Sequence, residues 1–399
     1  MDAQRLREDF PALAANPGLA YFDNACTTLK PKTVIGAVND YYSKYPACAG
    51  RSNHRLSRQV DESLHVAREA VSKFIQCAPD HLLWTRNTTE GLNAVIAGLD
   101  YSKRPKVVTS VLEHHSLLLP LQRLAAEGKI QLHFAEPDAQ GLLSADSFAA
   151  LIDKSTALVA AHHTSNTTGA RAPLKEITKA AHDAGARVLV DGAQAVPHCA
   201  VRFKDEGYDF MAFSGHKMLG PTGIGALAAR PEALREMRPL LIGGETIRVA
   251  TLRTNEPLPA PERYEAGIQH YSGILGLAAA TAYLQKVGPA NIEKHELALA
   301  AKVEQAVLAC GGKLYGPKAA QKSSGLVAFN LPGIPAHQTA ALLDKASGIA
   351  VRSGYFCAQP ACEFLGAKEG AARASLYLYN TGEEVEKFAK ALEQIKQLS

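Results

Sequence analysis

The chain has 399 residues, of which 47% are hydrophobic and 21% charged, enough apolar material for a sizeable core. A disordered or fibrous protein is therefore excluded, and a length of ~100–200 residues per domain predicts two domains or one large and one small. The 43 Lys and Arg against 39 Asp and Glu leave a formal net charge of +4. The charge is spread without a dense basic run, which excludes an electrostatic argument for nucleic acid or an anionic membrane as a direct partner.

The N-terminal segment MDAQRLREDFPAL is charged and lacks the apolar region of a secretory signal. No apolar stretch approaches the ~20 residues needed to span a bilayer. The cysteines are odd in number and scattered, without zinc-type pairs or a Cys-x-x-Cys motif: Cys26, Cys48, Cys77, Cys199, Cys310, Cys357 and Cys362. Such a set is typical of reduced thiols, so we expect a cytoplasmic protein without a structural zinc site.

Apolar segments of strand length alternate with segments of helical spacing, such as the stripe from Val60 to Phe74. The predicted strands are LLWT (82–85), KVVTSVL (106–112), ALVAAH (157–162), RVLVD (187–191) and DFMAFS (209–214). They are almost wholly apolar, as in strands buried on both faces. This pattern predicts an α/β fold with a mainly parallel central sheet flanked by helices.

The alternation stops near residue 290, where a long helical segment (291–310) begins. The later strand candidates LVAFNL (326–331) and ASLYLY (374–379) do not continue it. We therefore predict a large α/β domain over residues 17–287 and a smaller α+β domain over residues 1–16 and 288–399.

Polar segments follow the predicted strands at the point where each strand ends. They are RNTTE (86–90), EHH (113–115), HHTSN (162–166), DGAQ (191–194) and SGHK (214–217). Open parallel sheets bind ligands beyond the carboxyl ends of their strands, so we expect these segments to share one site.

Asp191 and Lys217 form either a simple salt bridge or part of a cofactor site. The segment that carries Lys217 continues as GPTGIG, whose small residues let the backbone approach a bulky group. Pyridoxal 5'-phosphate (PLP) requires a lysine for a Schiff base, a carboxylate for its pyridinium nitrogen and a phosphate cradle. Thr88 and Thr89 begin a helix, where they act either as an ordinary cap or as phosphate donors.

Ten segments in this order cover nearly the whole chain: YFDNACTTLKP, SNHRLS, RNTTEGLN, LEHHS, TSNTTGA, VDGAQAVPH, SGHKMLGPTGIG, RYEAG, VRSGYFCAQP and RASLYLYNT. Together they resemble the class V (fold type I) PLP-dependent enzymes, and among these the group II cysteine desulfurases. The resemblance implies a homodimer that converts L-cysteine to L-alanine and holds the sulfur as a cysteine persulfide. A sulfur-acceptor protein or thiol would then take the sulfur, for example in iron–sulfur cluster assembly.

The resemblance also implies residue roles. The catalytic residues would be Lys217, Cys357 and His114. The cofactor would contact Thr88, Thr89, His114, Asp191, Gln194, Ser214, His216 and Lys217. The substrate would contact Asn166, Arg373, Arg352 and His54. No metal ligands are implied.

Cys357 is expected to be the nucleophile. A free cysteine is most often a small buried hydrophobe, which suits Cys77 or Cys310. Cys357 instead lies in a segment with Gly and Pro that is typical of a loop, and Arg352 close to it would favour the thiolate.

Four residues depart from the family pattern. Tyr355 and Phe356 stand where two histidines often precede the nucleophile, which affects proton handling near Cys357. Ile268 replaces a threonine that would reach the partner subunit's phosphate group. Cys26 replaces an alanine, either as a space-filling residue or as a second thiol near the substrate.

Two other motifs do not fit their surroundings in the chain. The segment Gly223–Ala228 matches a loose dinucleotide fingerprint, but Pro221 and Pro231 leave no room for the required helix. The pairs at 114–115 and 162–163 invite a metal site, yet neighbouring residues on a strand point to opposite faces.

Two alternatives to the desulfurase remain open. One is another PLP reaction on the same fold: selenocysteine lyase, cysteine-sulfinate desulfinase, a different C–S lyase or an amino-acid epimerase. The other is a non-enzymatic scaffold that binds a sulfur carrier, against which the set of Lys217, Asp191, His114 and Arg373 argues.

Overall fold

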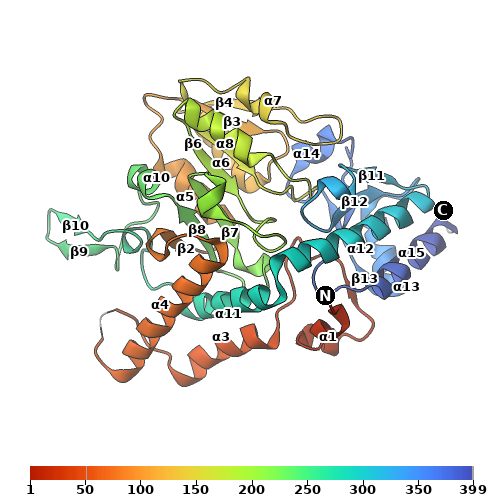
Figure 1. Ribbon diagram of the computed structural model, residues 1–399, viewed down its shortest axis with the longest axis horizontal. Coiled ribbons are helices and arrows are strands. Elements are labelled where there is room, and N and C mark those ends of the chain that lie inside the picture. The colour runs from red at the N-terminus through yellow and green to blue at the C-terminus, as the bar shows by residue number, and fades with distance from the viewer. Residues whose placement is uncertain (51, 398–399) are drawn as a thin grey trace.

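The computed structural model describes residues 1–50 and 52–397. Within them, a central sheet has seven strands in the order β2-β8-β7-β6-β5-β3-β4 (Figure 1). All neighbours are parallel except that β8 is antiparallel to both β2 and β7. The strands are β2 (Leu82–Thr85), β3 (Lys106–Ser110), β4 (Gln131–Ala135), β5 (Thr156–His162), β6 (Arg187–Asp191), β7 (Phe210–Ser214) and β8 (Gly225–Ala229). The predicted α/β fold with a mainly parallel sheet is confirmed.

Alternate side chains of the central strands enter two separate hydrophobic cores. On β6, Val188 and Val190 belong to one core and Leu189 to the other. A strand sends successive side chains to opposite faces, so both faces of the sheet are buried. Helices supply the remaining cover: α4 (Arg55–Ile75), α5 (Thr88–Gly98), α6 (His115–Ala126), α7 (Ala145–Ala149), α8 (Leu174–Asp183), α9 (Phe203–Glu206), α10 (Pro231–Glu236) and α11 (Tyr271–Val287).

A second, antiparallel sheet has the order β11-β12-β15-β14 and packs against the C-terminal helices. Its strands are β11 (Lys313–Tyr315), β12 (Leu326–Asn330), β14 (Arg352–Gly354) and β15 (Ala371–Ser375). Its helices are α12 (Pro289–Ala309), α13 (Ala336–Ser347), α14 (Gln359–Phe364) and α15 (Gly382–Gln397). The expected strand at 374–379 therefore ends at Ser375.

The N-terminal segment contacts both parts of the molecule. Phe10 and Leu13 pack in the large core, whereas Ala20 and Phe22 pack in the C-terminal core. The elements here are α1 (Ala3–Arg7), α2 (Pro11–Ala15), β1 (Ala20–Tyr21), α3 (Lys32–Lys44) and β13 (Ile349–Ala350), with β1 parallel to β13. The chain thus crosses between the two cores near residue 20, and the domain boundaries given above stay a prediction.

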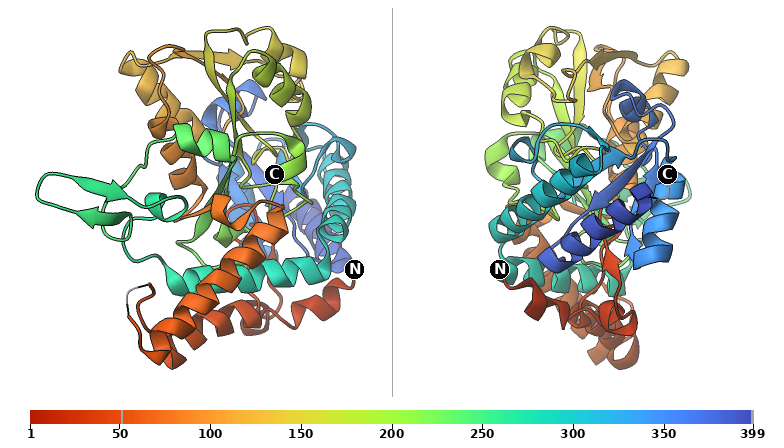
Figure 2. Two further views of the ribbon diagram at one scale, coloured as in Figure 1. Left: turned by 60° about the vertical axis from the view of Figure 1, so that its left-hand side comes forward. Right: turned by 90° about the vertical axis from the view of Figure 1, so that its right-hand side faces the viewer.

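A hairpin of β9 (Ile247–Ala250) and β10 (Asn255–Pro257) projects from the body of the molecule (Figure 2). It carries apolar side chains into solvent, and Val249 is 51% exposed. The segment that leads to it exposes Ile242 to 75%. Exposed apolar side chains gathered on one projection are typical of an interaction surface.

Short 3₁₀ helices complete the chain at η1 (Pro79–His81), η2 (Gly215–Lys217), η3 (Glu262–Tyr264) and η4 (Ala319–Gln321). The dinucleotide-like segment at 223–228 runs into β8 and is followed by the six-residue helix α10. A dinucleotide fingerprint needs a strand before its glycines and a full helix after them, so the observed order does not fit one. Among residues 1–50 and 52–397, no helix is both long and apolar enough to cross a membrane.

Candidate active site

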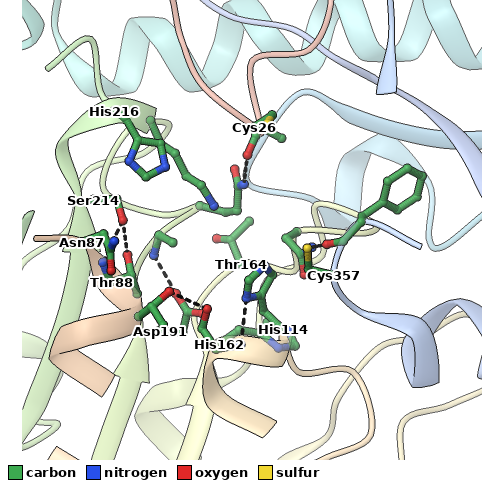
Figure 3. Close-up of a pocket in the computed structure, with 18 of the residues that line it drawn as sticks. Cys26, Asn87, Thr88, His114, His162, Thr164, Asp191, Ser214, His216 and Cys357 are labelled. Carbon is green, nitrogen blue, oxygen red and sulfur yellow. Dashed lines mark hydrogen bonds between the residues drawn. The ribbon is translucent and has the colours of Figure 1, made fainter. Parts of the chain in front are cut away.

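One cavity of about 230 Å³ lies beyond the carboxyl ends of the central strands (Figure 3). A single water needs only ~10–15 Å³ by the same measure, so the cavity has room for a small-molecule ligand. It is lined by every predicted site residue except His54: Thr88, Thr89, His114, Asn166, Asp191, Gln194, Ser214, His216, Lys217, Arg352, Cys357 and Arg373. The fold therefore brings together residues that are far apart in the chain, as the strand-end segments predict.

Asp191 and Lys217 form the floor of this cavity. Asp191 is the last residue of β6, and its Oδ1 accepts a hydrogen bond of 2.9 Å from the Ala193 N–H. Burial raises the pKa of Asp191, although the Ala193 N–H and the Lys217 charge oppose the rise. Burial lowers the pKa of Lys217, against the attraction of Asp191. A neutral amine is thus more accessible at Lys217 than at an exposed lysine, as a nucleophile or base requires.

The first turn of α5 forms a polar corner of the cavity. Asn87 caps the helix by accepting from the Glu90 N–H, which leaves the two threonine hydroxyls free for other partners. The Thr88 hydroxyl lies 2.6 Å from Ser214 Oγ. The Thr89 hydroxyl lies 2.7 Å from Ser116 Oγ. A helix N-terminus surrounded by hydroxyls favours a bound phosphate group.

Two glycines allow α5 to start beside β7 and β8. A Cβ at Gly225 would overlap the Phe213 carbonyl oxygen and lie 2.9 Å from Asn87 Cα. A Cβ at Gly91 would lie 2.9 Å from the Cβ of Ala212. These close approaches place the capped end of the helix at the strand ends, and no larger residue fits there.

His114 and His216 are neutral rings at the cavity wall. His114 caps α6, and its Nδ1 accepts from the Ser116 N–H at 3.0 Å, so Nε2 carries the proton. Burial together with the Lys217 and His115 charges lowers the pKa of His114 to about 3. Burial, Lys217 and Lys30 lower the pKa of His216 to about 4. Uncharged imidazoles can contact a flat ring or a phosphate without adding positive charge at neutral pH.

Arg373 and Arg352 make the opposite wall positive. They are directly paired across β15 and β14, so both side chains lie on one face of that sheet. Arg373 is 3% exposed; its Nη1 donates to the Asn166 carbonyl oxygen at 2.6 Å, and Nε has no partner within the described residues. Asp23 is 3.8 Å from Nη2. A buried guanidinium with free donor capacity favours a carboxylate ligand.

The Cys357 loop lies against this wall. Phe356 and Cys357 both have left-handed backbones, with φ of 54° and 57°. Asn166 Nδ2 donates to the Phe356 carbonyl oxygen at 2.8 Å, and the His115 N–H donates to that of Cys357 at 2.7 Å. The Phe356 ring lies 4.7 Å from the Arg373 guanidinium. The thiol is exposed and faces the cavity, so it is open both to a bound ligand and to solvent.

His54 lies elsewhere in this chain. It caps α4 by accepting from the Ser57 N–H at 3.2 Å, and it does not line the cavity. Its predicted substrate contact stays a prediction. Ile268 is 69% exposed, and its apolar side chain cannot donate a hydrogen bond to a phosphate group. The neighbouring Gln269 uses its Nε2 to donate to the carbonyl oxygens of Ala266 and Gly267.

Cys26 lines the cavity, and so do several residues to which the motifs assign no role, among them His162 and Phe356. The prediction for Phe356 noted only that it departs from a histidine pattern, and its contact with Arg373 depends on loop geometry. His162 belongs to the strand-end segment 162–166 that is expected at the site, but the motifs assign it no role of its own. Its position at the end of β5, beside Asp191 on β6, was the signal that could have identified it.

The comparisons with known proteins agree with this geometry. The model of the aminotransferase class-V family matches residues 20–388. A probable cysteine desulfurase from Pyrococcus abyssi is 40% identical over 98% of this chain and 96% of its own. The cysteine desulfurase of Haloferax volcanii is 36% identical over 100% of this chain and 98% of its own.

Solved structures give the same result. The apo cysteine desulfurase from Thermococcus onnurineus has a TM-score of 0.94 at 39% identity, covering 99% of this chain and 98% of its own. The cysteine desulfurase CsdA from Escherichia coli has a TM-score of 0.92 at 32% identity, covering 100% and 99%. The resemblance stated from the motifs is confirmed. The chain belongs to the aminotransferase class-V family, and its relatives there include cysteine desulfurases.

Proposed function

We propose that this protein is a PLP-dependent cysteine desulfurase that converts L-cysteine to L-alanine and holds the released sulfur as a persulfide on Cys357. The observation that carries the proposal is the cavity itself, where Lys217 and Asp191 face a buried arginine and an exposed thiol. The names of the relatives, which match this chain over nearly their full length, support the same activity.

The residues of the cavity fit PLP. Gln194 Nε2 donates to the Ala25 carbonyl oxygen, while its buried Oε1 has no partner within the described residues. A polar group on a ligand would satisfy that atom. Asp191 would hold the ring nitrogen and His114 the ring face. The phosphate would lie at the start of α5, among Thr88, Thr89, Ser214 and His216.

When bound, PLP supplies an aldehyde carbon that accepts an amine and a ring that takes up the electron pair released at the substrate's Cα. Lys217 supplies that amine and then moves the Cα proton, which its burial-lowered pKa favours. Arg373 binds the substrate carboxylate, and the Asn166 carbonyl oxygen orients the guanidinium.

Cys357 receives the sulfur. Its thiolate attacks the substrate Sγ, an S–S bond forms, and the Cβ–S bond breaks with its electron pair left on the carbon. Protonation of that carbon completes alanine. Because the loop is exposed, an acceptor protein or a small thiol can then attack the outer sulfur.

We also propose a homodimer in which the second copy covers the projecting hairpin. The exposed Val249, Leu252 and Ile242 side chains would then be buried. Sedimentation velocity tests this: a dimer is expected, and Leu252→Glu together with Val249→Glu should increase the monomer fraction. A wild-type chain that is monomeric at micromolar concentration contradicts the dimer.

The function is tested by mass spectrometry of the intact protein and its peptides after brief exposure to L-cysteine. One added sulfur is expected on the Cys357 peptide of the wild type and of Cys26→Ser, and none on Cys357→Ser. Sulfur on Cys26 in place of Cys357 would overturn the choice of nucleophile. Alanine production at the wild-type rate by Cys357→Ser would overturn it as well.

A further inference from the structure

The floor of the cavity holds a third titratable group, His162, which the mechanism above does not use. It is 4% exposed, lies at the end of β5 and lines the same cavity as Asp191 (Figure 3). In the sheet it is paired in register with Asp191 on β6. Paired residues on neighbouring strands ~4.8 Å apart send their side chains to the same face.

His162 is held from behind by a buried carboxylate. Its Nδ1 lies 3.0 Å from Glu113 Oε1, and its backbone N–H donates to Glu113 Oε2 at 2.9 Å. Glu113 is 0% exposed and also accepts from the Ser110 hydroxyl at 2.5 Å. A carboxylate without solvent is stable only beside donors and a cation, and His162 forms the ion pair with it.

Burial alone opposes the protonation of His162, but the charge and hydrogen bond of Glu113, together with Asp191, outweigh it and raise its pKa. Asp191 in turn faces Lys217, Glu113 and His162. The Lys217 charge is not a constant partner, because that nitrogen gains and loses a proton as it reacts with an aldehyde and moves the Cα proton. His162 takes no part in these changes and lies beside Asp191.

We infer that His162, held in its protonated form by the Glu113 carboxylate, is a positioning residue that keeps Asp191 ionised throughout the reaction, so that the cofactor's ring nitrogen stays protonated. The carboxylate at β6 would otherwise tend to become neutral, because it is desolvated and the charge of its Lys217 partner is not constant. This inference rests on the proposed cofactor, but the charge of His162 belongs to the chain and can be measured without it.

The first test is ¹⁵N NMR of the full chain, labelled in histidine and free of cofactor, over a pH titration. The His162 signal, assigned by its loss in His162→Gln, is expected to be that of an imidazolium at pH 7. The pH midpoint of the His162 titration should be lower in the Glu113→Gln variant and, by a smaller amount, in the Asp191→Asn variant. A neutral His162 at pH 7 overturns the inference whether or not the protein is a desulfurase.

The second test is the pH titration of the visible absorbance of the PLP-loaded protein. If Asp191 becomes neutral, the ring nitrogen no longer keeps its positive charge, and this loss favours the protonated form of the Lys217–PLP linkage. His162→Gln should therefore raise the midpoint by about one pH unit, at the low end of the ~1–3 units by which a neighbouring charge shifts a pKa. Glu113→Gln should also raise it, and the double variant should raise it no further than the larger single effect, because either change removes the imidazolium.

His163→Gln is the matched control. His163 is the next residue and is equally buried, but it lies outside the cavity and bonds Thr164 and Glu206. The midpoint of the absorbance titration of His163→Gln should match that of the wild type. Circular dichroism and the melting temperature show which variants are folded. A folded His162→Gln with an unchanged midpoint would mean that His162 only satisfies Glu113, and the inference would be wrong. Failure of sulfur transfer to Cys357 would instead reject the proposed function.

Discussion

The floor and the Cys357 wall of the cavity are built differently. The floor is the edge of a parallel sheet, where strand register fixes His162 beside Asp191 and the side chains are almost fully buried. The wall ends in a loop with two consecutive left-handed residues and an exposed thiol. The floor thus suits groups that must keep one geometry, whereas the wall suits a group that must meet both a ligand and an outside acceptor.

Lys217→Ala removes one of the floor residues and should have the largest effect on activity. Alanine formation from L-cysteine should fall by at least ~10²–10⁴-fold, the usual contribution of a positioned acid–base group. Lys129→Ala, at an exposed lysine, is the control. A Lys217→Ala protein within tenfold of the wild type would contradict the role of the floor.

Arg373→Lys should have the second-largest effect, on the binding of substrate at the Cys357 wall. Replacing the fork by a single ammonium loses a charge-assisted hydrogen bond, so KM for L-cysteine should rise by about 10–100-fold. Cysteamine, which lacks the carboxylate, is the matched substrate and should show little change between wild type and variant. Equal losses with both compounds would show that Arg373 does not bind the carboxylate.

His216, at the cavity wall next to Lys217 of the floor, makes the folded chain sensitive to acid. Its pKa is about 4 in the folded chain against 6.5 for the free side chain, so the unfolded state binds the proton first. The free energy of unfolding should fall as pH decreases from about 6.5 to 4, by at most about 3 kcal/mol from this group. Urea denaturation of the cofactor-free protein measures it. His216→Gln should flatten this dependence, while His65→Gln, at an exposed histidine, should leave it unchanged.

Phe356→Leu should have the smallest effect and would sharpen the comparison. It removes the ring over Arg373 but keeps apolar volume, so KM for L-cysteine should rise about 3–30-fold through loss of the cation–π contact. Phe356→Tyr retains the ring face and should stay near the wild type. If the Phe356→Leu and Phe356→Tyr variants have the same KM for L-cysteine, the ring face does not hold the guanidinium.

The two regions also differ in how far the sequence predicted them. The strand-end motifs gave Asp191, Lys217 and the Thr88–Thr89 corner, because apolar runs and the polar residues after them are local patterns. The same patterns could not give the Glu113–His162 pair, since it depends on which face each side chain takes in the sheet. The Phe356–Arg373 contact depends on the left-handed backbone at Phe356 and Cys357, a conformation that neither phenylalanine nor cysteine prefers. The place of His54, which caps α4, was not visible in its motif either.

The left-handed backbone at Phe356 and Cys357 has a consequence for engineering this protein. Each non-glycine residue in that conformation costs roughly 1–2 kcal/mol, so glycine in place of the exposed Cys357 would relieve backbone strain. At 356 the loss of a ring that is only 7% exposed would outweigh the same relief. Directed evolution for thermostability alone would therefore select against the thiol that carries the sulfur, and a screen for more stable variants should hold codon 357 fixed.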